Sequence, residues 1–177
     1  MKTKFNHNTL KQAIVSAIVL GSFILGPHSN ADRVTAVMNV GVSVIYSCSM
    51  NTSSMAFGAY DGVGANASIA LKATATVIST CTSGAEALIT MNAGASAGSG
   101  SASAPVRRMT TGTGKYLYYQ VFSDVAHDTV WGNTALTGVA LTGTGSPQTL
   151  TVYGSIPSAQ MVPEGEYSDQ IIVTITY

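Results

Sequence analysis

The chain of 177 residues has few charges and few cysteines. Asp, Glu, Lys and Arg together make up 9% of it, and eight basic residues balance eight acidic ones. So little positive charge argues against nucleic acid or an anionic membrane surface as a partner. Beyond residue 31 the sequence also has no continuous apolar stripe at the i, i+3, i+4 spacing of an amphipathic helix, so we do not expect helices.

The one long apolar run lies near the start of the chain. Residues 13–26 carry no charge, follow three lysines, and are followed by small residues at Ser29 and Ala31. This order is typical of a secretory signal peptide, so we expect residues 1–31 to be cleaved off. A membrane anchor is the alternative, but the run is shorter than the roughly 20 residues that a span needs. The exported part, 32–177, would be one domain with five basic and eight acidic residues.

The two cysteines, Cys48 and Cys81, both lie in the exported part. An even number of cysteines in an oxidising compartment predicts a disulfide. A redox-active pair is the alternative, but it is disfavoured because the sequence has no C-x-x-C motif.

Short alternating segments, separated by turns rich in Gly, Pro, Asn and Ser, predict an antiparallel all-β sandwich. A complete immunoglobulin-type sandwich needs seven strands, and we find six. We therefore expect an incomplete immunoglobulin-like sandwich that lacks its last strand. The expected strands are 40–48, 67–80, 86–91, 115–123, 148–153 and 167–177.

The start of the exported part contains more strand than one domain can use. Residues 32–47 would span about 50 Å as one strand, against the usual five or six residues of a strand. We therefore expect a donor-strand extension at 32–40 and a folded domain at 41–177. In the alternative, residues 32–40 fold back and complete a closed sandwich. The donor positions, which share one alternating phase, are Val34, Ala36, Met38 and Val40.

The final strand predicts a matching vacancy. Ile171, Val173 and Ile175 alternate with other residues, and no returning strand follows them. An open edge there would leave backbone groups unpaired and an apolar groove in water, so these three residues are candidates for the edge of an acceptor groove. A strand from a neighbouring copy could fill the groove by β-strand addition, and head-to-tail insertion of this kind builds a filament.

Four features, taken in order along the chain, resemble the spore coat protein U domain family. This family includes the pilins of archaic (Csu-type) chaperone–usher pili. The last of the four is a Gly-x-Tyr-x-Asp turn that leads into the final strand. The matching residues are Cys48 with Cys81, Phe57 to Asp61, Tyr116 to Asp124 with Trp131 and Gly132, and Gly165, Tyr167 and Asp169.

The resemblance implies a structural role in a pilus. Such pilins are periplasmic subunits whose immunoglobulin-like fold lacks its final strand. A periplasmic chaperone lends them a strand, an outer-membrane usher secretes them, and the extension of the next subunit replaces the chaperone's strand. We therefore expect a pilus shaft subunit at the cell surface, with the chaperone, the usher and other copies or sister pilins as partners, serving attachment and biofilm formation. A spore or cell-surface coat protein is the alternative within the family.

Other chemistries find little support in the sequence. Asp124, His127 and Asp128 could ligate a metal, but a polar turn explains them equally well, and we expect no metal, cofactor, small-molecule substrate or enzymatic activity. Trp131 could stack on a sugar, as in a secreted carbohydrate-binding module, although such a Trp more often packs on the core. We expect Arg107 and Arg108 to be a solvated pair in a loop.

Overall fold

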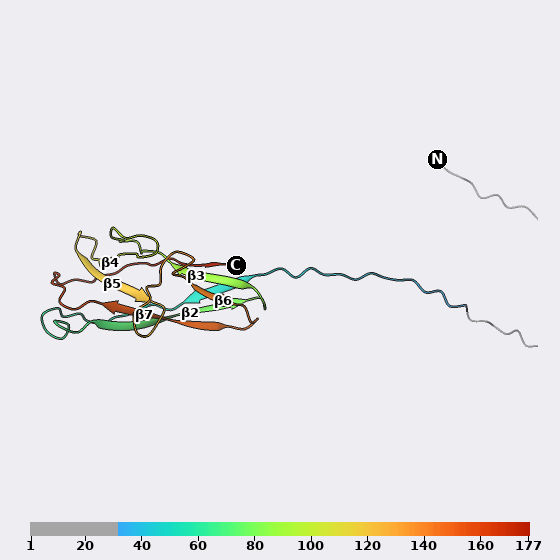
Figure 1. Ribbon diagram of the computed structural model, residues 1–177, viewed down its shortest axis with the longest axis horizontal. Helices are drawn as coiled ribbons and strands as arrows, with labels where there is room; N and C mark the ends of the chain where they lie inside the picture. Colours follow the sequence, from blue (N-terminus) through green and yellow to red (C-terminus); the bar gives the residue numbers. More distant parts are fainter. Residues whose placement is uncertain (1–31) are drawn as a thin grey trace, which may run out of the picture. The chain divides into compact units, whose positions relative to one another are not determined.

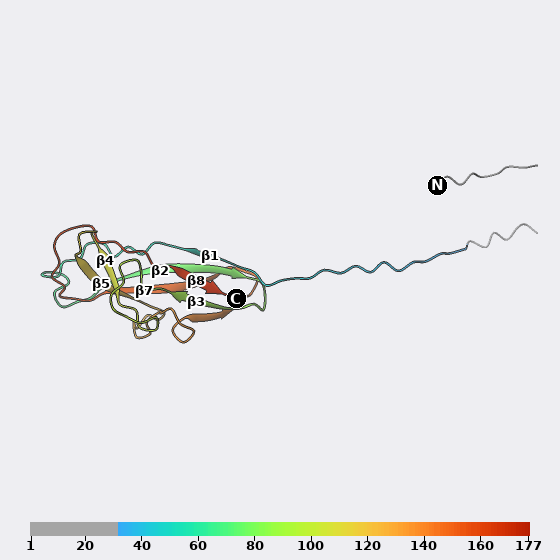
Figure 2. The same ribbon diagram turned by 90° about the horizontal axis from the view of Figure 1, so that it is seen from above.

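The computed structural model describes residues 32–177, which fold without helices (Figures 1 and 2). The signal peptide expected at 1–31 lies outside the described residues. Within the described part of the chain, no helix is long and apolar enough to cross a membrane. Residues Val42–Tyr177 form one compact unit.

This unit consists of two antiparallel sheets, which confirms the all-β sandwich. One sheet has five strands in the order β1-β2-β7-β5-β4, and the other has three in the order β6-β3-β8. The strands are β1 (Cys48–Thr52), β2 (Leu71–Cys81), β3 (Glu86–Met91), β4 (Arg107–Thr110), β5 (Tyr116–Phe122), β6 (Val139–Thr142), β7 (Gln148–Ile156) and β8 (Val173–Thr176).

The structure has eight strands where the sequence predicts six. The strand expected at 40–48 begins only at Cys48, because β2 ends at Cys81, directly opposite Cys48, and leaves no strand for earlier residues to pair with. The prediction also missed β4 and β6. Both have only four residues, and β4 begins with two arginines, which do not mark a strand.

The core lies between the two sheets and explains the position of Trp131. This side chain is 1% exposed, and its indole N–H donates to the carbonyl oxygen of Ile89 at 2.9 Å. The next residue must be small, since a Cβ on Gly132 would come 2.9 Å from the carbonyl oxygen of Ala102. Trp131 is therefore a core residue and is not available to stack on a sugar.

Arg107 is also buried, so the prediction of a solvated loop pair is wrong for this residue. It is 1% exposed, and its guanidinium donates to the carbonyl oxygens of Met91 (3.0 Å), Asn92 (2.7 and 2.9 Å) and Trp131 (2.7 Å), and to the side-chain oxygen of Gln120. Burial lowers the pKa of Arg107 to about 10 because it disfavours the cation. The side chain is therefore still charged at neutral pH and joins β4 to the end of β3.

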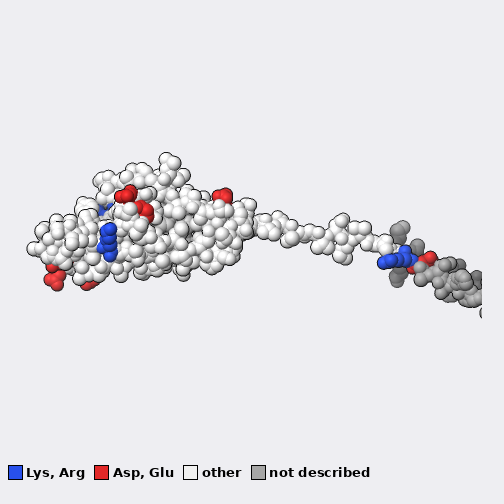
Figure 3. Space-filling view, turned by 60° about the horizontal axis from the view of Figure 1, so that its bottom comes forward, with Lys and Arg blue, Asp and Glu red and all other residues white. Residues whose placement is uncertain are grey.

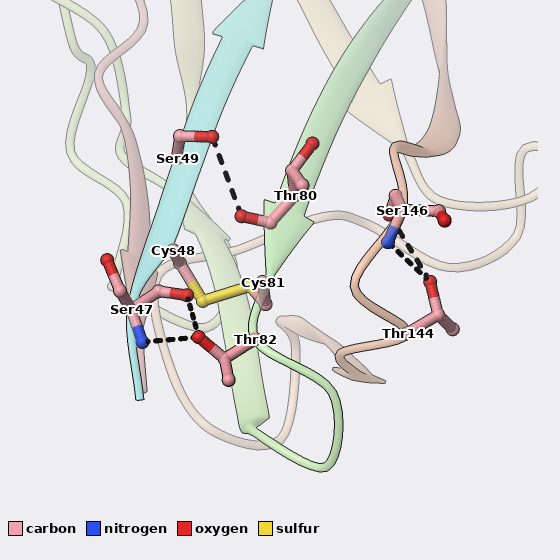
Figure 4. Close-up of a disulfide and its surroundings, with 8 residues drawn as sticks. All are labelled: Ser47, Cys48, Ser49, Thr80, Cys81, Thr82, Thr144 and Ser146. Atoms are coloured by element: carbon pink, nitrogen blue, oxygen red, sulfur yellow. Dashed lines mark hydrogen bonds between the residues drawn. A yellow bond between two sulfur atoms is a disulfide. The ribbon is translucent and has the colours of Figure 1, made fainter. Parts of the chain in front are cut away.

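The disulfide predicted from the sequence is present between Cys48 and Cys81 (Figure 4). It joins the first residue of β1 to the last residue of β2. Next to it, the amide of Ser47 donates to the hydroxyl of Thr82 at 3.1 Å, and the amide of Thr82 donates to the carbonyl oxygen of Ser47 at 2.9 Å. These bonds fix the point at which the chain enters the sandwich.

We predict that replacing both cysteines by alanine lowers the free energy of unfolding by about 3–4 kcal/mol, because the crosslink closes a loop of 33 residues. Guanidinium unfolding of the two proteins measures this difference. A reduced wild-type chain is the control and should match the variant. Equal stability of the oxidised and reduced proteins would contradict the prediction.

We also predict that Arg107→Met lowers the free energy of unfolding by about 3 kcal/mol or more, since it leaves buried carbonyl groups without a donor. Arg108→Met is the matched control. Arg108 also donates to two carbonyl oxygens, those of Ser96 (3.0 Å) and Ala97 (2.6 Å), but it is only half-buried, so its loss should cost about 1 kcal/mol. Equal losses of unfolding free energy in the two variants would show that buried Arg107 stabilises the fold no more than half-buried Arg108 does.

Candidate functional site

The candidate site is an apolar groove with one wall from residues 52–63 and the other from residues 160–173. Its inner part is a cavity of about 330 Å³, which lies between the residues that follow β1 and those that lead into β8. Buried core side chains form its floor. The apolar and aromatic side chains that line this inner cavity are Met55, Phe57, Ala75, Val77, Met91, Met109, Tyr119, Val121, Val152, Tyr167, Ile171 and Val173.

A larger outer cavity, about 810 Å³, continues the groove. It is lined by residues 55–63 and 160–167, with Leu117 and Ile156 as buried apolar contacts. The two cavities share Met55, Phe57, Met109 and Tyr167. They are therefore one groove, which exposes the core between the two walls.

Both strands beside the groove are edge strands. β1 pairs only with β2, and β8 pairs only with β3 among the described residues. Ile171 and Val173 line the inner cavity, whereas Ile175 packs further along, against the cluster that contains Cys81. One side of β8 is thus open for backbone hydrogen bonds.

The segment just before β8 is held by buried and half-buried polar groups. The hydroxyl of Tyr119 donates to Asp169 at 2.7 Å, and the amide of Ser96 donates to the other oxygen of that carboxylate at 3.0 Å. Burial, together with the bond to Asp169, raises the pKa of Tyr119 well above its usual value, so this hydroxyl remains a donor. The side chain of Asn92 accepts a bond from the amide of Ile172 at 2.9 Å, and its backbone is held by Arg107.

The motif tyrosines secure the two walls of the groove. The hydroxyl of Tyr60 donates to the carbonyl oxygen of Pro157 at 2.7 Å and accepts from the amide of Gln160 at 2.9 Å, so it ties one wall to the other. The hydroxyl of Tyr167 donates to the carbonyl oxygen of Pro163 at 2.9 Å and stabilises the turn before β8. The motif residues therefore shape the groove.

Few charged side chains line the groove. Figure 3 shows that one whole face of the domain also carries few charged side chains. Among the residues that the structure describes, no Lys, Arg or His lines either cavity, and the acidic side chains of the outer cavity are Asp61, Glu164 and Glu166. The backbone amides of Gly64 and Val63 donate to Asp61 and lower the pKa of its carboxyl. An occupant of this groove would need apolar side chains and no negative charge.

The predicted donor residues lie in extended chain outside any strand. Val34 is 94% exposed, Met38 is 84% exposed and Val40 is 89% exposed, and Ala36 is exposed as well. Residues 34–47 contain no charged side chain. This leader is thus the chemical complement of the groove.

Residues 124–128 form a turn. The carboxylate of Asp124 accepts the backbone amides of Asp128 (3.1 Å) and Thr129 (2.6 Å), and these bonds lower its pKa. The ring of His127 packs edge-on against Phe122 and Tyr153. Among residues 32–177, no group of three or more His, Cys, Asp or Glu side chains is placed to hold a metal ion.

The sequence predicted a last strand at 167–177, of which only Val173–Thr176 is a strand, and it identified the motif residues but not the groups that hold them. Arg107, Asn92, Tyr119 and Gln160 were not singled out for any such role. Only Arg107 left a signal, because a charged residue is rare in this chain and can be buried only with many partners. The apolar wall from residue 52 to 57 was not predicted either.

The sequence matches the family described as Spore Coat Protein U domain over residues 34–174. "Protein U" of Myxococcus xanthus is 34% identical over 178 aligned positions, which cover 96% of this chain and 99% of that protein.

The fold is similar to a chain in the crystal structure of the CsuC–CsuE chaperone–tip adhesion subunit pre-assembly complex of archaic chaperone–usher Csu pili from Acinetobacter baumannii, with a TM-score of 0.54 and 17% identity. The match covers 76% of this chain and 40% of that one. Because the family pattern spans the two sheets, the groove and most of the leader, the chain belongs to the Spore Coat Protein U domain family.

Proposed function

We propose that the protein is a structural subunit of an extracellular pilus shaft, without enzymatic activity, that polymerises by donor-strand exchange. In this proposal residues 1–31 are a signal peptide, residues 32–40 are the donor strand, and residues 41–177 form the domain that accepts the strand of another copy. The observation that carries the proposal is that one chain has both an open, largely apolar groove and an exposed apolar leader, residues 34–47, that contains no charged side chain.

The energetics of insertion support this function. Burial of Val34, Met38 and Val40 would contribute about 5–9 kcal/mol. Each backbone hydrogen bond to the open side of β8 would add about 1 kcal/mol. This sum is comparable to the whole stability of an ordinary domain, about 5–15 kcal/mol. Insertion would therefore complete the fold.

The groove also needs a cover before polymerisation, since its apolar floor and the open side of β8 favour non-specific association. A periplasmic chaperone that lends a strand would provide this cover, and an outer-membrane usher would then pass the subunit to the growing pilus. The similar fold found in a chaperone–subunit pre-assembly complex supports this route. Surface attachment and biofilm formation would follow from the pilus.

A surface coat protein is the second candidate. The description of the family and the identity of 34% to "Protein U" favour it. Genes for a chaperone and an usher beside the gene for this protein, together with filaments on the cells in electron micrographs, would support the pilus. An amorphous or layered deposit without filaments would support the coat.

We predict that Val34→Thr with Met38→Thr abolishes polymerisation of the exported chain, because two apolar side chains would no longer be buried in the groove. Val37→Thr is the control, since Val37 lies in the opposite phase and is 91% exposed. Sedimentation and electron microscopy of the secreted protein measure filament length, and circular dichroism checks the fold of the subunit. Filaments of normal length from the double variant would overturn the proposed function.

We further predict that a second copy of residues 32–47, fused after Tyr177 through a short flexible linker, yields a stable monomer that does not polymerise. Filling its own groove should raise the free energy of unfolding by about 5–9 kcal/mol. The matched control carries threonine at the four donor positions of the added copy and should gain little. A fused protein that still forms filaments would show that the groove is not the acceptor.

A further inference from the structure

The structure leaves a second apolar segment without a partner, between the proposed donor strand and β1. Val42 is 91% exposed and Val44 is 79% exposed, and no residue from 41 to 47 belongs to a strand. The sequence assigned this segment to the first strand of the domain, and the position of Cys48 opposite Cys81 rules that out. In a filament, a linker of this kind would expose a row of valines to water at every junction.

The inner cavity is too short to hold the whole leader. Its β8 side is lined by Tyr167, Ser168, Asp169, Ile171 and Val173, and the seven residues from 167 to 173 span about 23 Å when extended. A donor paired along this wall would use about seven residues, the length of 34–40. Residues 41–46 of that donor would then extend beyond the inner cavity.

The direction of insertion decides where these residues lie. The chain enters the sandwich beside the disulfide, where Ser47 bonds to Thr82, and Ile175 packs near the same disulfide. A head-to-tail filament places the body of the donor copy at the other end of the groove, because this end is used by the acceptor's own leader. Residues 41–46 of the donor would therefore lie along the outer cavity.

We infer that the donor segment extends to residue 44 or beyond, and that Val42 and Val44 of one copy fill the outer cavity of the next. This inference rests on the proposed function and extends the donor strand beyond residues 32–40. Both residues share the alternating phase of Val34, Ala36, Met38 and Val40. The outer cavity offers apolar contacts from Met109, Leu117, Ile156 and Val162 and, at about 810 Å³, has more room than the inner cavity.

Two adjacent residues provide a matched test in the full exported chain. Val44 and Ile45 are 79% and 77% exposed, but only Val44 lies in the donor phase. Val44→Thr should speed the dissociation of filaments in guanidinium by about tenfold, the effect of losing one buried apolar side chain, and Ile45→Thr should change the rate much less. Adding Val42→Thr to Val44→Thr should speed dissociation further.

The variant Val34→Thr with Met38→Thr, assayed beside them, separates this inference from the proposed function. Failure of that variant to polymerise, together with faster dissociation for Val44→Thr than for Ile45→Thr, supports both. If that variant fails to polymerise but the filaments of Val44→Thr and Ile45→Thr dissociate at equal rates, the longer donor is overturned and donor-strand exchange is still supported. If that variant forms normal filaments, donor-strand exchange and the longer donor both fail.

Discussion

The groove and the leader both depend on the unpaired edge of β8. β8 bonds to β3 on one side only, and the apolar side chains beside it lie open in a groove that reaches the core. A strand in this position has unsatisfied backbone groups and exposed apolar surface, and both drive association. The composition of the leader follows from this constraint, because a segment that enters a largely apolar groove bordered by acidic side chains must lack negative charge and must present its apolar side chains at alternate positions.

A strand that is paired on one side needs other interactions to stabilise it. For β8 and the residues before it these are polar: the bond from Tyr119 to Asp169, the bond from Ile172 to Asn92, and the bond from the guanidinium of Arg107 to the carbonyl oxygen of Asn92. A buried cation is expensive unless its donors are satisfied, and Arg107 meets this condition with backbone carbonyl groups and an amide oxygen. The chain's own contacts thus fix the shape of this side of the groove.

The sequence predicted the class of fold, the disulfide and four of the strands well, since alternation and paired cysteines are local signals. It failed for β4 and β6, which are too short to show a period. It also failed for the residues before Cys48, which alternate between apolar and other side chains but have no neighbouring strand to pair with. The groove was predicted from its β8 side alone. Its other wall, from residue 52 to 63, is not a strand beyond Thr52 and has no periodic pattern. Arg107 was misjudged because burial depends on partners that are distant in sequence.

A sandwich with open edges can associate in more than one way, so a filament of defined structure requires other edges to be closed. At β4 this is achieved by the chain itself. The amide of Gly98 donates to the carbonyl oxygen of Val106 at 2.8 Å, and Thr110 and Ser168 exchange two backbone bonds, at 3.0 and 3.1 Å. The small-residue loop 92–104 therefore covers the start of this edge. Pairing at the two ends of β4 makes this edge a poor competitor for an incoming strand, and so favours entry at the groove, which is the condition for linear growth.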